Sequence, residues 1–320
     1  MIDLHLHTNH SIRAKDTYLL EQLVRNDRIT PTSCSIAETD STGRLIETAK
    51  RKGLSAIAIT DHWSTDGFCE ARVKAEESGI RCIPGIELAV PQSVDGETHE
   101  THVLGYGFSV DDPGLKKLCA DAAATCARGV AACLAGLPRI GIEVSKPELQ
   151  QKHPEGITGW AIRRWLVQQG YAVDKYDATG IQQRAVKRAL NDDLVDRPQA
   201  IASASTVAEI TGVLHRAGAT VFLAHPFWLT YPSQGSCSEE TVWRYIEAAL
   251  AAGVDGVEAY APCHSPRQTQ MITDLCRARR IPASGGSDSR SVDGFAASEP
   301  VSDDVLVSIM KYRKHHDPWE

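Results

Sequence analysis

The chain opens with an alternation of apolar and polar residues. In residues 1–11, three aliphatic side chains alternate with three polar ones, Asp3, His5 and His7. A strand has a period of two, so the polar side chains would share one face. The Cα atoms of His5 and His7 would then lie about 6 to 7 Å apart, and both imidazoles could reach one metal ion. A half-buried edge strand with solvated histidines fits the same pattern, so this stretch alone leaves both interpretations open.

Further along the chain, apolar runs and helical patterns alternate. The predicted strands are 54–60, 82–86, 102–108, 220–224, 256–260 and 282–285. The predicted helices between them are 44–52, 70–78, 239–252 and one that begins after the capping box Ser265-x-x-Gln268. Alternating strands and helices with short links indicate an α/β fold with a parallel sheet, open or closed into a barrel. Such sheets gather functional side chains at the carboxyl ends of their strands.

A helical region interrupts this alternation between about residues 113 and 218. Its predicted helices are 115–137, one capped by Ser145-x-x-Glu148, 158–169, about 182–191, and one capped by Thr206-x-x-Glu209. We therefore expect a discontinuous α/β domain of residues 1–112 and 219–320, with a helical insertion domain at 113–218. A further helix is expected near 18–24, followed by a long loop at 26–43.

The composition narrows the class of protein. The chain has 320 residues, of which 42% are hydrophobic, enough for a large core. Acidic residues outnumber basic ones, 41 to 34, and there is no extended lysine or arginine run, which argues against a polymeric nucleic-acid partner. We see no uninterrupted apolar run near the roughly 18 residues of a membrane span, and no signal-peptide pattern at the start. These features predict a cytoplasmic protein without a membrane partner.

The nine cysteines do not suggest disulfides or a cysteine-bound metal. Their number is odd, and there is no Cys-x-x-Cys pair. Cys119, Cys126 and Cys133 recur every seven residues in a predicted helix, so neighbours lie about 10 Å apart along its axis, beyond disulfide reach. Any metal is therefore expected on nitrogen and oxygen ligands.

Such ligands are present at the edges of the apolar runs. The candidates are His5, His7, His62, Glu87, His102, His225 and Asp288. Imidazoles combined with carboxylates suit zinc, iron or manganese, and a carboxylate such as Glu87 can bridge two ions. His102 is preferred to His99, because the two face opposite sides of a strand and only His102 opens the apolar run. Seven independent solvated strand ends are the alternative, but their shared position favours a metal centre.

Six short motifs, in order, resemble those of the PHP (polymerase and histidinol phosphatase) family. They are DLHLHT at 3–8, AITDH at 58–62, PGIE at 84–87, HVLGYG at 102–107, AHP at 224–226 and GGSD at 285–288. The resemblance implies a distorted (β/α)7 barrel with two or three divalent metal ions, manganese, zinc or iron, at its mouth. It is closest to the branch that contains nucleotide phosphatases acting on AMP and on 3',5'-bisphosphate nucleotides.

The resemblance also assigns roles to individual residues. It places His5, His7, Glu87 and Asp288 on a first metal, Glu87, His102 and His225 on a second, and His62 at a third site. Asp16, with Asp40 as a fallback, is the best match for a third-site aspartate that the family usually carries nearer the first motif. Arg290 stands where the family commonly has a histidine. A guanidinium cannot ligate a metal, so we expect Arg290 to hold the phosphate as a planar fork.

The insertion and one late motif supply the remaining substrate candidates. The sequence Gly-Trp-Ala-Ile-Arg-Arg at 159–164 departs from the Gly-Arg-x-His that the nucleotide branch tends to have. Arg163 and Trp160 are candidates to reach the substrate, and solvated or core helix positions are the alternative. Candidates to stack on a base also include Trp165, Tyr171 and Tyr176. His264 follows a strand end and matches a similar family stretch, which suggests a phosphate contact.

We therefore expect a metal-dependent phosphomonoesterase that acts on a small phosphorylated substrate, with a nucleotide favoured, through a metal-activated hydroxide that attacks phosphorus. Glu87, Arg290 and His264 would be catalytic, and Asp3 would fix an imidazole from behind. A helical cap would recognise the rest of the substrate. Two alternatives stay open: a histidinol-phosphate or sugar-phosphate phosphatase, and a metal-binding regulatory module without catalysis. The oligomeric state is not legible from the sequence.

Overall fold

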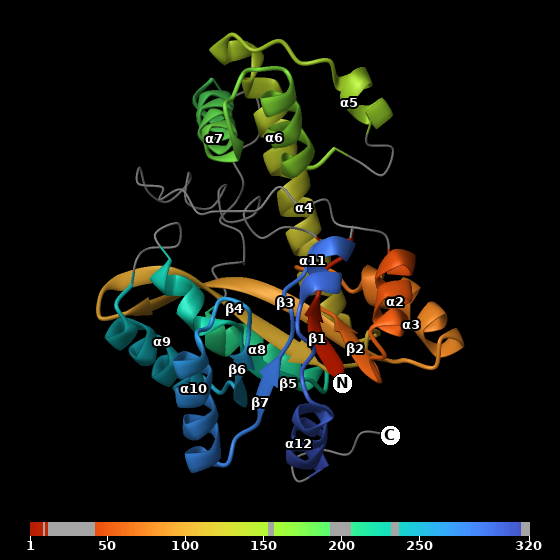
Figure 1. Ribbon diagram of the computed structural model, residues 1–320. Coiled ribbons are helices and arrows are strands. Elements are labelled where there is room, and N and C mark those ends of the chain that lie inside the picture. Colours follow the sequence, from red (N-terminus) through yellow and green to blue (C-terminus); the bar gives the residue numbers. More distant parts are fainter. Residues whose placement is uncertain (9, 12–41, 153–156, 193–205, 232–236, 315–320) are drawn as a thin grey trace. The chain divides into compact units, whose positions relative to one another are not determined.

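The computed structural model describes residues 1–8, 10–11, 42–152, 157–192, 206–231 and 237–314 (Figure 1). Contacts divide them into two compact units. The sheet unit holds the described residues up to Cys119 and from Thr206 onward, and the helical unit holds residues 120–152 and 157–192. Asp16, Asp40, the expected helix at 18–24 and nearly all of the loop at 26–43 lie outside the described residues.

The sheet unit is built on a seven-stranded sheet whose strands are neighbours in chain order. They are β1 (Ile2–Leu6), β2 (Ala56–Ile59), β3 (Arg81–Val94), β4 (Glu97–Tyr106), β5 (Thr220–Leu223), β6 (Gly256–Tyr260) and β7 (Ala283–Gly285). The chain just after β7 returns to β1, where Ser289 bridges Leu6 and accepts a hydrogen bond from the His7 N–H at 3.0 Å. This contact closes the sheet in the manner of a distorted barrel. The alternation of strands and helices confirms the expected α/β class.

Strand β4 corrects the expectation of a wholly parallel sheet, because it runs antiparallel to both β3 and β5. Strands β3 and β4 form a long hairpin that turns at Asp95 and Gly96, with φ angles of 53° and 83°. Two successive positive φ angles are typical of a type I′ turn, for which Asp-Gly is a favoured sequence. Since β4 runs backwards, its early residues lie at the edge where the parallel strands end. This is why His102 opens its apolar run whereas the other candidates close theirs.

The helices of the sheet unit are α2 (Thr42–Arg51), α3 (Asp66–Glu77), α8 (Val207–Arg216), α9 (Glu239–Ala251), α10 (Pro266–Arg279), α11 (Val292–Ala297) and α12 (Asp303–Lys314). One buried cluster packs α2, α3 and α11 against β1 and β2, through residues such as Leu45, Phe68 and Phe295. The expected capping boxes at the starts of α8 and α10 are both present. The two short C-terminal helices α11 and α12 were not predicted.

The boundary between the units differs from the expected insertion at 113–218. Helix α8 packs against β3, β4 and β5, and so belongs to the sheet unit. The long helix α4 (Pro113–Gly136) starts in the sheet unit, and its residues from 120 onward belong to the helical unit. A capped amphipathic helix has the same sequence pattern in either unit, so the sequence could not show to which unit α8 belongs.

The helical unit has its own core. Besides the end of α4, it contains the 3-10 turn η1 (Pro138–Ile140), α5 (Lys146–Lys152), α6 (Gly159–Gln168) and α7 (Lys175–Asn191). Leu137, Leu149, Ile162 and Leu166 are fully buried in one cluster of this unit. Helix α4 meets α7 at Gly136, where a Cβ atom would overlap the carbonyl oxygen of Ala185. Only glycine allows the two backbones to come this close.

Helix α4 is long and apolar enough to cross a membrane by length and composition alone, which qualifies the earlier expectation. This is weak evidence, because core helices pass the same test. Its residues Ala132, Cys133 and Leu134 are buried in the core of the helical unit. The cysteines among the described residues are free thiols, and those of the seven-residue stripe are buried or half-buried.

Candidate metal centre

Glu87 lies at the centre of the candidate site. It belongs to β3 and its side chain is fully buried. Its Oε2 atom lies 3.4, 3.2 and 3.1 Å from the Nε2 atoms of His5, His7 and His62. Its Oε1 atom lies 2.7 Å from Nδ1 of His102 and 3.0 Å from Nε2 of His225. Each oxygen of one carboxylate thus faces its own set of imidazoles.

The fold explains why these residues meet. His5 lies in β1 and His7 directly follows it, and His62, His225 and Asp288 come two or three residues after the ends of β2, β5 and β7. The Oδ1 atom of Asp288 lies 3.0 Å from Nε2 of His7 and 3.6 Å from Nε2 of His5. All seven residues put forward from the sequence therefore gather at one edge of the sheet. His99 does not: it lies beside Cys237 and Tyr245.

The donor atoms fit a bound cation. His5, His7, Glu87 and Asp288 each offer one ligand atom within 4.8 Å of the others, and so do His62, Glu87 and His102. His5 Nε2 and Glu87 Oε2 are buried and have no hydrogen-bond partner in the described part of the chain. Buried polar atoms normally have a partner, and a metal ion between these atoms would supply it. Nitrogen with carboxylate oxygen suits manganese, zinc or iron.

The electrostatics of the cluster also favour a cation. Burial opposes ionisation of Glu87, yet the surrounding His62, His102 and His5 hold its pKa well below the usual range. Burial likewise opposes ionisation of Asp288, and Arg290 is the largest influence that keeps its pKa well below the usual range. Burial lowers the pKa of His62 well below 6.5, although the charge of Glu87 opposes this shift. The centre therefore holds two carboxylates whose pKa values favour the ionised form.

Backbone strain is concentrated at the cluster. Five described residues other than glycine have positive φ, and three of them lie in or beside the site: Trp63 at 54°, His225 at 23° and Asp288 at 47°. The other two occur where such angles are common, Asp95 in the hairpin turn and Arg280 at a helix C-cap. Each strained residue costs about 1 to 3 kcal/mol, and such strain persists where the surroundings impose it, often at functional sites.

The expected role of Asp3 needs correction. Asp3 is buried, but its Oδ1 atom accepts the backbone N–H groups of His5 at 3.1 Å and Ser287 at 3.0 Å, rather than an imidazole N–H. It therefore ties β1 to the segment after β7. Glu258 in β6 makes the imidazole contact instead, with Oε1 2.9 Å from Nδ1 of His5.

The sequence interpretation missed three supporting carboxylates. Glu258 sits among buried apolar residues of β6, and a charged residue inside an apolar strand was the available signal. The Oε1 atom of Glu100 lies 3.3 Å from Nε2 of His102, two positions along the same strand face. Asp61 accepts hydrogen bonds from the Thr8 N–H and hydroxyl, each at 2.6 Å, and so joins the ends of β1 and β2. Such carboxylates orient the ligands that they contact.

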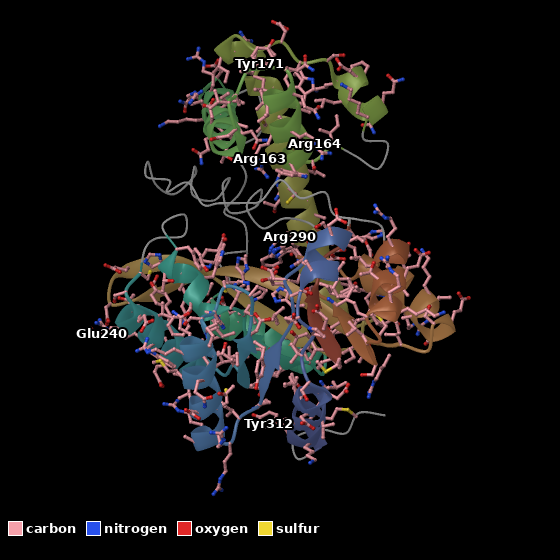
Figure 2. The ribbon with its side chains drawn as sticks, viewed as in Figure 1. Arg163, Arg164, Tyr171, Glu240, Arg290 and Tyr312 are labelled. Atoms are coloured by element: carbon pink, nitrogen blue, oxygen red, sulfur yellow. The ribbon has the colours of Figure 1, made fainter. Side chains whose placement is uncertain are left out.

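Arg290 reaches the cluster, as expected. Its Nη2 atom lies 3.3 Å from Oδ1 of Asp288 and 3.4 Å from Nε2 of His62. The side chain is 14% exposed. Figure 2 labels Arg290 in the sheet unit.

His264 contacts Ala259 and Phe227. Its Nδ1 atom donates to the carbonyl oxygen of Ala259 at 2.9 Å, and its ring packs edge-on against Phe227. Burial lowers the pKa of His264, so the ring is neutral and Nε2 carries a lone pair. Its Nε2 atom is buried and has no hydrogen-bond partner among the described residues, and the expected phosphate contact stays a prediction.

The insertion candidates serve the helical unit itself. Arg163 is 3% exposed, and its Nη1 donates to Oε1 of Gln182 at 2.9 Å. Its guanidinium also lies over the ring of Trp160, 5.8 Å from the centroid. Trp165 is in the core and packs against Tyr171. Figure 2 labels Arg163 in α6 and Tyr171 just after it. These contacts of Arg163 are internal to the helical unit, and its substrate contact stays a prediction.

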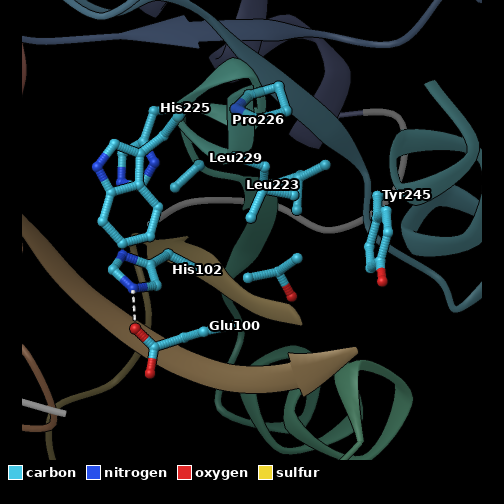
Figure 3. Close-up of a pocket in the computed structure, with 10 residues that line it drawn as sticks. Glu100, His102, Leu223, His225, Pro226, Leu229 and Tyr245 are labelled. Carbon is cyan, nitrogen blue, oxygen red and sulfur yellow. Dashed lines mark hydrogen bonds and ion pairs between the residues drawn. The ribbon is translucent and has the colours of Figure 1, made fainter. Parts of the chain in front are cut away.

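A small pocket opens beside His102 and His225 (Figure 3). Apart from these histidines and Glu100, its lining is largely apolar or aromatic and includes Trp228 and Tyr245. The Trp228 ring lies 5.0 Å from that of His102 and 5.4 Å from that of His225. The two imidazoles on the Oε1 side of Glu87 therefore border this pocket, and the Trp228 ring lies against both of them.

The chain is similar to several known proteins. The family model described as PHP domain matches residues 31–157. The chain is 23% identical over 252 residues to the phosphoribosyl 1,2-cyclic phosphate 1,2-diphosphodiesterase of Eggerthella lenta, which covers 78% of this chain and 88% of that protein. It is 26% identical over 250 residues to a 5'-3' exoribonuclease of Haemophilus influenzae, covering 76% and 82%. It is 24% identical over 257 residues to the 3',5'-nucleoside bisphosphate phosphatase of Chromobacterium violaceum, covering 76% and 80%.

Two solved structures have a similar fold. A protein of Bifidobacterium adolescentis assigned as a metal-dependent phosphoesterase matches with a TM-score of 0.63 and 20% identity, over 97% of this chain and 96% of that one. An amidohydrolase of Chromobacterium violaceum, solved with sulfate and without metal, matches with a TM-score of 0.62 and 21% identity, over 96% of each chain. The chain thus matches the PHP domain over residues 31–157 and shares its fold with these two structures.

Proposed function

We propose that the protein is a phosphomonoesterase that releases phosphate from a small nucleotide, with AMP and 3',5'-bisphosphate nucleotides as the first candidates. The observation that carries this proposal is the buried Glu87, whose two oxygens face two separate sets of imidazoles. A carboxylate placed in this way is suited to bridge a pair of metal ions. The similarity to a 3',5'-nucleoside bisphosphate phosphatase supports the choice of substrate.

Each half of the site would hold one ion. His5, His7 and Asp288 would complete the ligands on the Oε2 side of Glu87, and His102 and His225 those on the Oε1 side. A metal pair supplies a hydroxide near neutral pH and neutralises charge on the phosphoryl oxygens. The chain's own contribution is to hold the ligands rigidly, through strained backbone at His225 and Asp288 and through the carboxylates behind the imidazoles.

Arg290 would bind the phosphate. Its guanidinium already lies at the edge of the cluster, next to Asp288, and a planar fork matches two oxygens of a phosphate. The same guanidinium points at Nε2 of His62, so a third ion there would have to displace it against like charge. We therefore propose two ions rather than three. This proposal assigns no role to His264, whose Nδ1 donates to the carbonyl oxygen of Ala259.

A second candidate is hydrolysis of a phosphodiester, either a cyclic phosphate or the end of an RNA strand. Two of the relatives are named for these activities, and a metal pair serves monoesters and diesters alike. These similarities are the observation that favours a diester substrate.

One substrate panel separates these functions. Protein reconstituted with Mn²⁺ is assayed for phosphate release from AMP, a 3',5'-bisphosphate nucleotide, histidinol phosphate and a sugar phosphate. A cyclic nucleotide phosphate and a 5'-phosphorylated RNA oligonucleotide test the diesterase candidate. We expect release from the nucleotide monoesters, and a loss of at least about a thousandfold in Glu87→Ala and His225→Ala, because each variant removes a group aimed at the reacting centre.

Glu247→Gln is the matched control, since Glu247 is an exposed carboxylate paired with Arg279. It should keep wild-type activity. Turnover of RNA or the cyclic phosphate alone would favour the diesterase, and turnover of histidinol phosphate alone would favour that phosphatase. An intact His225→Ala variant would refute the metal assignment. No turnover with Mn²⁺, Zn²⁺ or Fe²⁺ would favour a metal-binding regulatory module.

A further inference from the structure

Glu258 is a carboxylate with two contacts at the candidate metal centre. It lies in the middle of β6 and is fully buried between Val257 and Ala259. A carboxylate is costly in such a place unless hydrogen bonds satisfy it. Its Oε1 atom lies 2.9 Å from Nδ1 of His5, and its Oε2 atom accepts the backbone N–H of His225 at 2.7 Å. One side chain therefore contacts a residue from each half of the site.

The contact with His5 selects the ring nitrogen that can bind a metal. A carboxylate oxygen accepts a hydrogen bond from an imidazole N–H, so this contact favours the tautomer with the proton on Nδ1 and leaves Nε2 as the metal-binding atom. Nε2 lies 3.4 Å from Oε2 of Glu87 and 3.6 Å from Oδ1 of Asp288. It has no hydrogen-bond partner among the described residues. It thus faces the space between two carboxylates, where a cation fits.

The contact with His225 holds a strained backbone. His225 has φ 23° and ψ 57°, a conformation that side-chain-bearing residues rarely adopt, and it directly precedes Pro226. Its N–H is held by Oε2 of Glu258. In this conformation Nε2 of His225 lies 3.0 Å from Oε1 of Glu87.

We propose that Glu258 is a positioning residue that assembles both halves of the metal centre at once. It fixes the tautomer of His5 on the Oε2 side of Glu87 and the backbone of His225 on the Oε1 side. The inference rests on the metal pair of the proposed function, and not on its substrate. His5, His225 and Glu258 are close enough to hold an ion among themselves, but both oxygens of Glu258 already accept N–H groups.

Two substitutions separate this role from a general loss of stability. The Glu258→Gln side chain has one oxygen and one NH2 group. The His225 N–H can only donate and takes the oxygen, so the NH2 group faces Nδ1 of His5 and leaves the ring proton on Nε2. We expect this variant to lose one of two Mn²⁺ ions. Glu258→Ala supports neither residue, and both ions should bind about 10- to 100-fold more weakly.

The measurements are Mn²⁺ titration of the metal-free full-length chain by calorimetry and metal content by mass spectrometry, with Glu247→Gln as the control. A Glu258→Gln variant that binds two Mn²⁺ ions with wild-type affinity would overturn the inference. Nitrogen NMR of the wild-type chain loaded with diamagnetic Zn²⁺ decides the matter even if the variants do not fold: His5 should bind through Nε2 and keep a proton on Nδ1. Binding through Nδ1 would overturn it. A wild-type chain that binds no divalent ion would instead refute the proposed function.

Discussion

The role of each residue at this site depends on which of its polar atoms can still bind a metal ion. Glu87 offers two oxygens to five imidazoles, and Glu258 and Glu100 engage the far nitrogens of His5 and His102. The histidines are therefore oriented before any ion binds. A loose set of histidines would lose conformational freedom on binding a metal, whereas this set has already lost it on folding.

Arg290 differs most from the metal-binding candidates around it, because a guanidinium cannot ligate a metal ion. We expect wild-type protein to hold two Mn²⁺ ions per chain after gel filtration, and Arg290→His to hold a third, because an imidazole can ligate where a guanidinium repels. Arg290→Ala should lower kcat/KM for a phosphate monoester by about a hundredfold or more, since it removes a charged donor.

Elemental analysis and steady-state kinetics check both results. Arg279→His is the control, because Arg279 pairs with Glu247 on the surface away from the site. Three ions in the wild-type chain would contradict the two-ion arrangement. A KM and kcat unchanged in Arg290→Ala would remove Arg290 from the substrate site.

At the scale of elements, the direction of β4 decides which side chains meet. If β4 ran parallel to its neighbours, its early residues would lie at the opposite edge of the sheet. The antiparallel hairpin brings His102 level with Ala224, whose N–H donates to the His102 carbonyl oxygen at 2.9 Å. The next residue, His225, then lies beside His102. A helical connection in place of the turn at Asp95 and Gly96 would not have built this half of the site.

The packing of α4 on α7 offers a test within the helical unit. Gly136→Ala should destabilise this unit by about 1 to 3 kcal/mol or more, because the added Cβ overlaps the Ala185 carbonyl oxygen. Gly180→Ala is the matched variant: Gly180 lies inside α7, and its nearest neighbour is the flexible Arg184 side chain at 3.7 Å. It should stabilise α7 by up to about 1 kcal/mol through helix propensity.

Hydrogen exchange of α6 and α7 measures the two effects locally. Protection should fall in Gly136→Ala and rise in Gly180→Ala. Equal and small changes in both variants would show that α4 and α7 do not pack closely at Gly136.

At the scale of the whole molecule, two separate cores share one chain. The candidate ligands all belong to the sheet unit, and they join β1, β3 and β4 to the segments after β2, β5 and β7. An ion bound by these residues stabilises the folded sheet unit, by about 2.7 kcal/mol at a free concentration 100 times the Kd.

Removal of metal should therefore act on one unit. We expect chelation to lower the melting temperature and to reduce hydrogen-exchange protection in the strands, while α6 and α7 keep theirs. Restoring Mn²⁺ should reverse the change, and Ca²⁺ should not, because its preference is for oxygen ligands. An equal loss of protection in both units would contradict this separation.

Much of the fold was predictable because local rules suffice for it. The capping boxes at Thr206 and Ser265 start α8 and α10 as expected, and the apolar run at 256–260 is β6. Hydrophobic periodicity and caps involve residues within one or two turns, so they can be recognised without the rest of the chain. The sequence predicted strands at 82–86 and 102–108 but missed the hairpin that joins them, because polar positions in its outer half interrupt the apolar pattern.

The candidate site, like the fold, could be predicted from the sequence only in part. The sequence by itself determined which residues could bind a metal, because each sits where an apolar strand begins or ends. Only the tertiary structure decided which nitrogen faces which oxygen, and that Glu258 rather than Asp3 supports His5. The sequence also could not show that Gln182 and Trp160 lie around Arg163. A side chain's residue type is local, but its partners come from strands and helices far away in the chain, and only folding brings them together.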